Sequence, residues 1–370
     1  MIIGVLKEIK ADENRVALSP GGVEFMRQNG HSILVEKNAG KPSGFTNDSY
    51  KKAGAEVIKR PESVFEQAEM ILRVKEPQPS EYNLLKKGQI YFAYLHFAAS
   101  EEVTRIMLDS GVISIAYETI QKDNGSLPLL KPMSEVAGDM AIQQGAKYLE
   151  MAQGGHGVLL GGVPGVDPAT VVILGGGVVG MNAAKLACGL GAKVYILDID
   201  LNRLRYLSDV MPGHCITLMS SPAAIREVLP KADVVVGAVL VPGSKTPNLV
   251  SREMLKSMKK GSVLVDVSID QGGCFETSKE TTHADPTYTV DGIVHYAVSN
   301  MPGALPRTST LALNNATLPY AAEIADKGWK KAMQENSEIK RGANVVEGKV
   351  TYKGVAEAFG LKYTAIDKLL

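Results

Sequence analysis

Residues 171–198 read VVILGGGVVGMNAAKLACGLGAKVYILD, and their pattern is the most informative feature of the chain. Its opening apolar run leads into Gly175, Gly177 and Gly180, which form a G-x-G-x-x-G pattern. A helical pattern follows, and a second apolar run ends in Asp198, about 20 residues beyond the glycines. Strand, glycine turn, helix, strand and terminal acid stand in the order of a dinucleotide-binding βαβ unit. The alternative is a strand-turn-helix that binds no ligand.

Each part of this stretch has a physical role at a dinucleotide site. Gly175 allows the tight turn, Gly177 lets the backbone approach a pyrophosphate, and Gly180 lets the helix pack closely on the strand. The first helical residues, Val178 and Val179, offer unpaired N–H groups at the positive end of the helix dipole. We therefore expect a pyrophosphate at the start of this helix.

Asp198 indicates which dinucleotide is bound. Its carboxylate would accept a hydrogen bond from a free ribose 2′-hydroxyl and would repel a 2′-phosphate, so NAD is favoured over NADP. Arg203 and Arg205 follow closely and could neutralise a phosphate. NADP therefore stays open as an alternative.

Length and charge set the outer limits. A chain of 370 residues has room for two domains of ordinary size, each with its own core. Forty basic residues balance forty acidic ones, so nothing favours a nucleic-acid partner or an anionic membrane surface. No apolar run approaches the roughly 20 residues of a membrane span, and the start, MIIGVLKEIKADE, becomes charged too early for a signal peptide. We expect a soluble, cytoplasmic protein.

The number and spacing of the cysteines indicate a reducing compartment. Cys188, Cys215 and Cys274 have neither the pairing of a disulfide framework nor the spacing of a zinc site. We expect them to fill core space, and no metal is predicted.

Apolar runs alternate with helical patterns in two blocks, which predicts an α/β fold in each. The strand-like runs of the first block are at 2–6, 33–36, 70–74, 90–95 and 112–116. Those of the second block are at 171–174, 194–197, 215–218, 234–238, 263–267 and 293–298. The second block thus predicts a six-stranded parallel sheet of Rossmann type, and the first a Rossmann-like or flavodoxin-like sheet.

The connections between the blocks give the domain boundaries. Ser134 is expected to cap a helix that runs to about residue 151, and a Gly-rich loop follows. After the sixth strand, a long helix is predicted from about 309 to 333. The tail, NVVEGKVTYKGVAEAFG, resembles a hairpin and helix without a core of its own, so it should return to the first domain. We predict a discontinuous substrate domain, 1–130 and 305–370, and an NAD-binding domain, 131–304.

Ligands in open α/β folds bind at the carboxyl ends of the strands, and several polar residues fall there. In the first block these are Arg15, Lys75 and His96. Two cations and a histidine indicate a site for a small carboxylic acid that undergoes redox chemistry. Arg15 can clamp a carboxylate bidentately, and His96 can exchange protons near neutral pH. In the second block the strand-end residues are Ser220, Val239, Leu240, Ser268, Ile269, Asp270, Ser299, Asn300 and Met301.

Structural roles compete with each of these functional ones. Arg15 could form a surface ion pair with an adjacent acid, and Lys75 could end its strand in solvent. His96 could be a core histidine, and Asp270 could cap a turn in SIDQGG. The residues by themselves leave these alternatives open.

Several motifs together resemble the family of alanine dehydrogenases and the nucleotide-binding subunit of proton-translocating transhydrogenase. They are GVLKEIKADENRVALSP, LRVKEP, YLHFA, KPMSEVAGDMA, LGGGVVGMNAA with LDID, VDVSIDQGGCFETS and VSNMPGALPRTST, and they span essentially the whole chain. The resemblance implies substrate binding by Arg15 and Lys75 and catalysis by His96 and Asp270. It implies NAD contacts from Ser134, Gly175, Gly177, Val178, Val179, Gly180, Asp198, Arg203, Ser220, Val239, Leu240, Val267, Ser268, Ile269, Asp270, Lys279, Val298, Ser299, Asn300 and Met301.

The resemblance also implies a reaction and an assembly. The reaction is reversible, NAD-dependent oxidative deamination of L-alanine to pyruvate and ammonium, and the assembly is a homo-oligomer, commonly a hexamer. Two alternatives remain. One is a non-catalytic NAD(H)-binding module like the transhydrogenase subunit, and the other is a related saccharopine-type amino-acid dehydrogenase.

Overall fold

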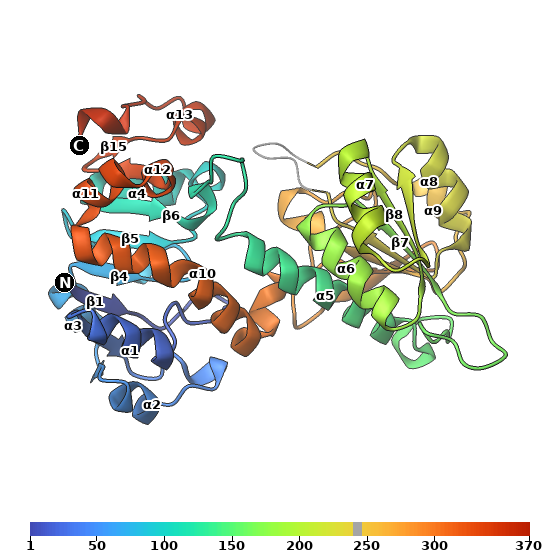
Figure 1. The fold of residues 1–370 in the computed structure, drawn as a ribbon, viewed down its shortest axis with the longest axis horizontal. Helices are drawn as coiled ribbons and strands as arrows, with labels where there is room; N and C mark the ends of the chain where they lie inside the picture. The colour runs from blue at the N-terminus through green and yellow to red at the C-terminus, as the bar shows by residue number, and fades with distance from the viewer. Residues whose placement is uncertain (240–245) are drawn as a thin grey trace. The chain divides into compact units, whose positions relative to one another are not determined.

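The computed structural model describes residues 1–239 and 246–370, and the chain divides into two compact units. Unit 1 contains Met1–Met133 and Gly303–Leu370, and unit 2 contains Ser134–Pro302. The sequence placed these divisions after residues 130 and 304. Each unit folds around its own sheet (Figure 1).

Unit 1 contains a sheet of eight strands in the order β15-β14-β6-β5-β4-β1-β2-β3. The six strands from β1 to β6 are parallel and follow the doubly wound order 3-2-1-4-5-6. Their bounds are β1 (Ile2–Val5), β2 (Ser32–Glu36), β3 (Glu56–Ile58), β4 (Met70–Leu72), β5 (Ile90–Ala93) and β6 (Ile113–Ala116). The five strands predicted for this block are confirmed, whereas β3 was missed because it is a half-exposed edge strand of three residues.

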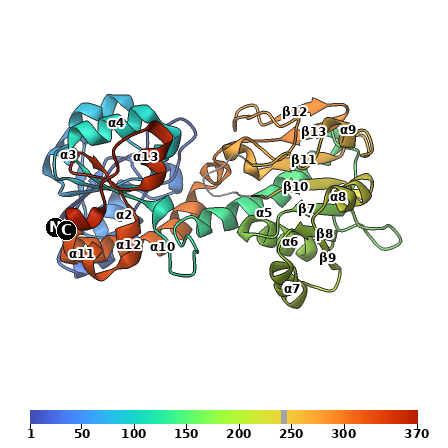
Figure 2. The same cartoon turned by 90° about the horizontal axis from the view of Figure 1, so that it is seen from above.

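Helices cover both faces of this sheet (Figure 2). On one face Val64, Met107 and Val355 bring α3, α4 and α13 against the strands. On the other, Val23 of α1 packs with buried residues of α10, α11 and α12. The bounds are α1 (Pro20–Gln28), α2 (Asn47–Lys52), α3 (Pro61–Gln67), α4 (Glu101–Ser110), α10 (Pro306–Lys327), α11 (Trp329–Glu335), α12 (Ser337–Arg341) and α13 (Lys353–Phe359).

The C-terminal segment completes unit 1. Strands β14 (Ala343–Val346) and β15 (Lys349–Val350) form the predicted hairpin, and β14 pairs antiparallel with β6. This pairing confirms that the domain is discontinuous. The single helix expected over 309–333 is wrong, because α10 ends at Lys327 and α11 begins at Trp329. Gly328 separates them at φ +74°, in the left-handed region where glycine carries no steric penalty.

Unit 2 contains a sheet of seven strands in the order β12-β13-β11-β10-β7-β8-β9. Its six predicted strands are present, all parallel, in the Rossmann order. The predicted number of strands is nevertheless wrong by one, because β12 pairs antiparallel with β13 at the edge. The bounds are β7 (Thr170–Leu174), β8 (Lys193–Asp198), β9 (Cys215–Met219), β10 (Val234–Gly237), β11 (Val263–Asp266), β12 (Thr287–Val290) and β13 (Ile293–Tyr296). As a partly exposed edge strand, β12 lacks the apolar run that marks the others.

Helices also cover both faces of the second sheet (Figure 2). Ile225 of α8 and Leu255 of α9 join the core on one face, while α5, α6 and α7 lie on the other. The bounds are α5 (Lys131–Tyr148), α6 (Val178–Gly189), α7 (Leu201–Val210), α8 (Pro222–Val228) and α9 (Arg252–Leu255). Within residues 1–239 and 246–370, no helix is long and apolar enough to cross a membrane.

Candidate functional site

The glycine turn of unit 2 has the shape of an anion cradle. Gly175 takes φ +105°, and a Cβ on Gly180 would lie 1.8 Å from the Gly175 carbonyl oxygen, so both positions exclude larger residues. Gly177 differs, because a Cβ there would meet no atom within 4 Å. Gly177 is the N-cap of α6 and has no side chain to cap it, so the first N–H groups of this helix receive no capping bond from it. The residues present therefore fit a dinucleotide pyrophosphate.

Asp198 and Arg203 hold the glycine turn from β8 and α7. The Asp198 carboxylate accepts the Gly176 N–H at 2.6 Å and the Asp200 N–H at 2.8 Å. The Arg203 guanidinium donates from Nε to the Gly176 carbonyl oxygen at 2.5 Å. Asp198 thus lies at the end of β8, where a ribose acid is expected, and Arg203 binds the protein backbone. Arg205 donates to Asn202 at 3.0 Å on the exposed side of α7.

Ser134 does not have the local role that the sequence suggested. Helix α5 begins at Lys131, so Ser134 lies in its first turn and is not its N-cap. One turn later, a Cβ on Gly138 would lie 2.4 Å from the Val179 carbonyl oxygen. This contact places the first part of α5 in unit 2 beside the start of α6.

Asp266 organises the loop that carries Asp270. Its buried carboxylate accepts the N–H groups of Ser268 at 3.0 Å and Cys274 at 2.9 Å, and also the Ser278 hydroxyl. Ser268 in turn donates its hydroxyl to the Val239 carbonyl oxygen at 2.7 Å, which ties this loop to the end of β10. Asp270 itself is exposed on the 3-10 helix Val267–Gln271. The structure thus explains the position of Asp270 through a residue that the sequence reasoning missed.

Most of the other cofactor candidates also follow strand ends of unit 2, whereas Lys279 lies in the segment between β11 and β12. Asn300 has a left-handed backbone at φ +54°, and Lys279 is exposed with its N–H donating to Tyr288 at 2.6 Å. Leu240 lies outside the described residues. Ser220 follows β9; Val267 and Ile269 flank Ser268; Val298, Ser299 and Met301 lie with Asn300 beyond β13.

In unit 1, Arg15 follows β1 and is buried with Glu13. Its Nε donates to Glu13 Oε1 at 2.6 Å, its Nη2 donates to Oε2 at 2.5 Å, and its Nη1 lies 3.0 Å from Met133 Sδ. Burial acts to raise the pKa of Glu13, but the hydrogen-bonded Arg15 holds that pKa below its usual value. The surface ion pair considered for Arg15 is therefore wrong, since both partners are buried. Glu13 thus occupies the Nε/Nη2 edge of the Arg15 guanidinium.

Lys75 and His96 follow β4 and β5, beside Arg15. Desolvation and the positive charge of Arg15 lower the pKa of the Lys75 amine. The protein packed around His96 also lowers its pKa, although one face of the residue is exposed, and Glu118 opposes this shift while Lys75 adds to it. The sheet places β1, β4 and β5 side by side, and the charge of Arg15 acts on Lys75 while that of Lys75 acts on His96. Strand order reverses between β1 and β4, which is where ligands bind in such sheets.

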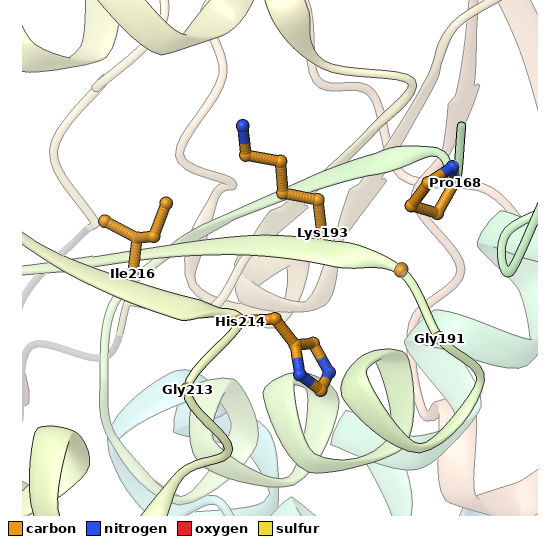
Figure 3. Close-up of a pocket in the computed structure, with 7 residues that line it drawn as sticks. Pro168, Gly191, Lys193, Gly213, His214 and Ile216 are labelled. Atoms are coloured by element: carbon orange, nitrogen blue, oxygen red, sulfur yellow. The ribbon is translucent and has the colours of Figure 1, made fainter.

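A cavity of about 370 Å³ lies at the amino ends of strands β7, β8 and β9, away from the carboxyl ends (Figure 3). Lys193 and His214, at the start of β8 and just before β9, extend from its walls in different directions. Its lining contains none of the candidate site residues. The carboxyl ends of the strands therefore remain the candidate site.

Family models match both parts of the chain. "Alanine dehydrogenase/PNT, N-terminal domain" matches residues 4–137, and "Alanine dehydrogenase/PNT, C-terminal domain" matches residues 141–353.

The chain belongs to the alanine dehydrogenase/PNT family.

Relatives in this family match over the full length. "Alanine dehydrogenase" of Methanococcus maripaludis is 56% identical and "Alanine dehydrogenase 2" of Staphylococcus aureus is 53% identical, each over 100% of both chains. A solved "L-alanine dehydrogenase" has a TM-score of 0.95 at 49% identity and covers 97% of this chain and 99% of its own. A transhydrogenase from Sinorhizobium meliloti has a TM-score of 0.82 at 25% identity, covering 95% and 99%.

This member of the alanine dehydrogenase/PNT family also has a buried ionic network that the sequence reasoning missed. Arg73 is fully buried and donates to both oxygens of Glu8 at 3.1 Å and to Glu81 at 2.5 Å. Glu8 Oε1 also accepts the Val74 N–H at 2.7 Å, so the network fixes the strand end that leads to Lys75. GVLKEIK and LRVKEP contain two of the three partners, but no spacing within either motif indicates the pairing.

Proposed function

We propose that the chain catalyses the NAD-dependent oxidation of L-alanine to pyruvate, with release of ammonium. The observation that carries this proposal is the grouping of Arg15, Lys75 and His96 at the reversal of strand order in unit 1. Two cations suit a substrate carboxylate, and a histidine with a lowered pKa suits a base at neutral pH. The names of the full-length relatives support the same reaction.

The proposed chemistry assigns a task to each group. When bound, NAD accepts the hydride that leaves the alanine Cα. Arg15 binds the carboxylate, and Lys75 adds a second positive charge beside it. Neutral His96 takes a proton from the substrate ammonium group and passes it to solvent. It then takes a proton from the water that adds to the iminium carbon and returns this proton to the carbinolamine nitrogen. The C–N bond then breaks, and the hydroxyl proton leaves with the nitrogen, so that pyruvate and ammonium form. Asp270 is proposed as a second catalytic group.

The assay that tests the proposal follows NADH formation with L-alanine and NAD. D-alanine, L-leucine, L-glutamate and saccharopine replace the substrate in parallel reactions, and NADP replaces NAD. We expect turnover confined largely to L-alanine with NAD. Saccharopine turnover would favour the related dehydrogenase, because a site for alanine needs room only for a methyl group.

The transhydrogenase-like alternative rests on the second solved structure and gives a different result. A pure NAD(H)-binding module would bind NADH but reduce no NAD with any amino acid. Replacement of His96 would then change neither NADH binding nor any rate. NADH binding without turnover would therefore make this alternative the better one.

NAD is the proposed cofactor, and the glycines at the two ends of α6 test its position. Gly177→Ala should weaken NADH binding about tenfold or more, a cost of about 1.4 kcal/mol, because the added methyl enters the space assigned to the pyrophosphate. Its thermal stability should not change, since that methyl meets no protein atom. Gly189→Ala on the same helix is the control, because its methyl is equally unobstructed but lies at the other end of α6. NADH affinity is measured by fluorescence titration. Equal affinity in both variants would show that the pyrophosphate does not bind beside Gly177.

The lowered pKa of His96 predicts a pH dependence. Only the neutral imidazole can take a proton, so kcat/KM for L-alanine should rise as pH increases through the His96 pKa. Desolvation and Lys75 lower this pKa, so the acid limb should lie below the usual histidine value of about 6.5. A pH profile from 5 to 9 tests this expectation. An acid limb that His96→Gln leaves unchanged would assign the limb to another group.

We also propose a homo-oligomer, with a hexamer as the expected form, and a cytoplasmic location. The loop between α5 and β7 exposes Met151, Leu159 and Val166 by 63% or more, so association through this loop would remove apolar surface from water. All three cysteines are unpaired, in agreement with a reducing compartment. Light scattering that gives about six chain masses would support the hexamer, and one chain mass would exclude it.

A further inference from the structure

Glu118 joins the strand end that carries His96 to the neighbouring strand. It is half-buried in the 3-10 helix Tyr117–Thr119, directly after β6. Its Oε1 accepts the His96 N–H at 2.5 Å and the Leu95 N–H at 3.0 Å, and its Oε2 lies 3.3 Å from the same Leu95 nitrogen. One carboxylate thus receives two consecutive backbone donors from the turn after β5.

The backbone at His96 needs such support. His96 has φ +47° and ψ +36°, a left-handed conformation that is unfavourable for a residue with a Cβ. Hydrogen bonds from backbone N–H groups to a carboxylate are among the strong ones, so Glu118 can hold the turn in this conformation. The His96 imidazole stacks on the Tyr94 ring, with the two ring centroids 6.2 Å apart. The imidazole direction therefore depends on a turn that Glu118 fixes.

Glu118 also has the largest effect of the charged groups that act on the His96 imidazole. The charged groups around it are Glu118 beyond β6, Lys75 and Glu76 beyond β4, and Lys10 beyond β1. The two glutamates raise the His96 pKa and the two lysines lower it, and Glu118 has the largest effect of the four. Lys10 and Glu76 pair at 2.5 Å, which partly cancels their influence. Glu118 is thus the main group that opposes the effect of Lys75 on the His96 pKa.

We propose that Glu118 is a positioning residue for His96, which it holds in place through the Leu95 and His96 amides while balancing the positive charge of Lys75. The catalytic part of this inference rests on the proposed function. Glu118 itself touches no substrate in this role. It acts on the reaction through the direction and the protonation of His96.

Two variants separate the hydrogen bonds from the charge. Glu118→Gln keeps a carbonyl oxygen that can accept both amides but removes the negative charge. Glu118→Asp keeps the charge but withdraws the oxygens from the amides by one methylene. Glu101→Gln is the matched control, because Glu101 lies on α4 near the same turn but is exposed and paired with Arg105. It removes an equal charge without touching either amide.

Each variant has a distinct expected result. In Glu118→Gln the His96 pKa should fall and the acid limb of kcat/KM should move to lower pH, with kcat at pH 8 within about tenfold of the parent. In Glu118→Asp kcat should fall about 100-fold, because a 1 Å displacement of a catalytic group costs about this much. Glu101→Gln should match the parent in all respects. A merely structural residue would change stability without moving the His96 titration.

The His96 titration is measured without the reaction. Diethyl pyrocarbonate acylates an imidazole only when the imidazole is neutral. The rate of acylation at the peptide that contains His96 is followed by mass spectrometry. Its pH dependence reports the His96 pKa in the unliganded protein. This readout holds even if L-alanine proves not to be the substrate. An unshifted His96 titration in Glu118→Gln, together with parental kcat in Glu118→Asp, would overturn the proposal. Failure of both variants to fold would also overturn it, because Glu118 would then serve the sheet and not His96.

Discussion

His96→Gln is expected to lower kcat for L-alanine oxidation by about 10²- to 10⁴-fold, the range that positioned acid–base groups contribute. Glutamine keeps a polar side chain of similar length but cannot take or return a proton near neutral pH. NADH affinity should stay at the parental value, because the candidate dinucleotide contacts belong to unit 2 and His96 belongs to unit 1. Thermal stability should also change little, since one face of His96 is exposed.

His214→Gln provides the comparison for this prediction. His214 is an exposed histidine just before β9, at the amino ends of the unit 2 strands, where it lines the cavity in Figure 3. Steady-state rates at pH 8 and NADH titrations should show loss of kcat in His96→Gln alone. A His96→Gln enzyme within about threefold of the parent would exclude His96 as the proton carrier and would favour the binding-module alternative.

Arg73→Leu is expected to reduce the free energy of unfolding by about 3–5 kcal/mol at neutral pH, which is typical when one partner of a buried ion pair is removed. Arg73 is fully buried between Glu8 and Glu81, so leucine would leave two carboxylates in the core without their cation. Arg60→Leu is the control, because the Arg60 side chain is 74% exposed and its bridge to Glu62 should contribute at most about 1 kcal/mol. Urea unfolding of the three proteins at one concentration gives the comparison.

The pH dependence of the Arg73 variant gives a second check. Burial already raises the pKa of Glu8 above its usual value, and loss of the Arg73 charge should raise it further. A carboxyl group whose pKa is raised by folding binds more protons in the folded state than in the unfolded one. The instability of Arg73→Leu should therefore be largest well above the Glu8 pKa and should shrink as pH falls through it. An instability that is equal at pH 5 and pH 8, or absent, would contradict this account.

The Arg73 network also connects stability to the site. Glu8 binds the Val74 amide directly before Lys75, so the same carboxylate that neutralises Arg73 ends the strand that presents Lys75. A buried charge network is weak evidence for net stability, because hydrophobic residues of equal volume can replace such networks without loss. We therefore expect its main contribution to be the geometry of the β4 strand end.

Local patterns predicted most of the fold because they report on burial within a few residues. The runs at 171–174, 194–197 and 234–238 are apolar on both faces, and they became the central strands β7, β8 and β10. Strands β3 and β12 were missed because edge strands are half-exposed and lack that signature. The division at Gly328 was missed because one glycine in a helical pattern does not reveal its backbone angle.

Two doubly wound α/β domains, the glycine turn with Asp198, and the strand ends that carry Arg15, Lys75 and His96 could all be predicted from the order of the residues. Each of these follows from local periodicity, a fixed spacing, or a resemblance that runs along the whole chain. The contacts that hold those residues are visible only in the folded chain. Glu13 occupies one side of Arg15, Glu118 binds the His96 amide 22 residues away, and Glu8 meets Arg73 65 residues away. Such pairs leave no periodic trace, because the sheet brings together strand ends whose separation in sequence is set only by the lengths of the intervening helices and loops.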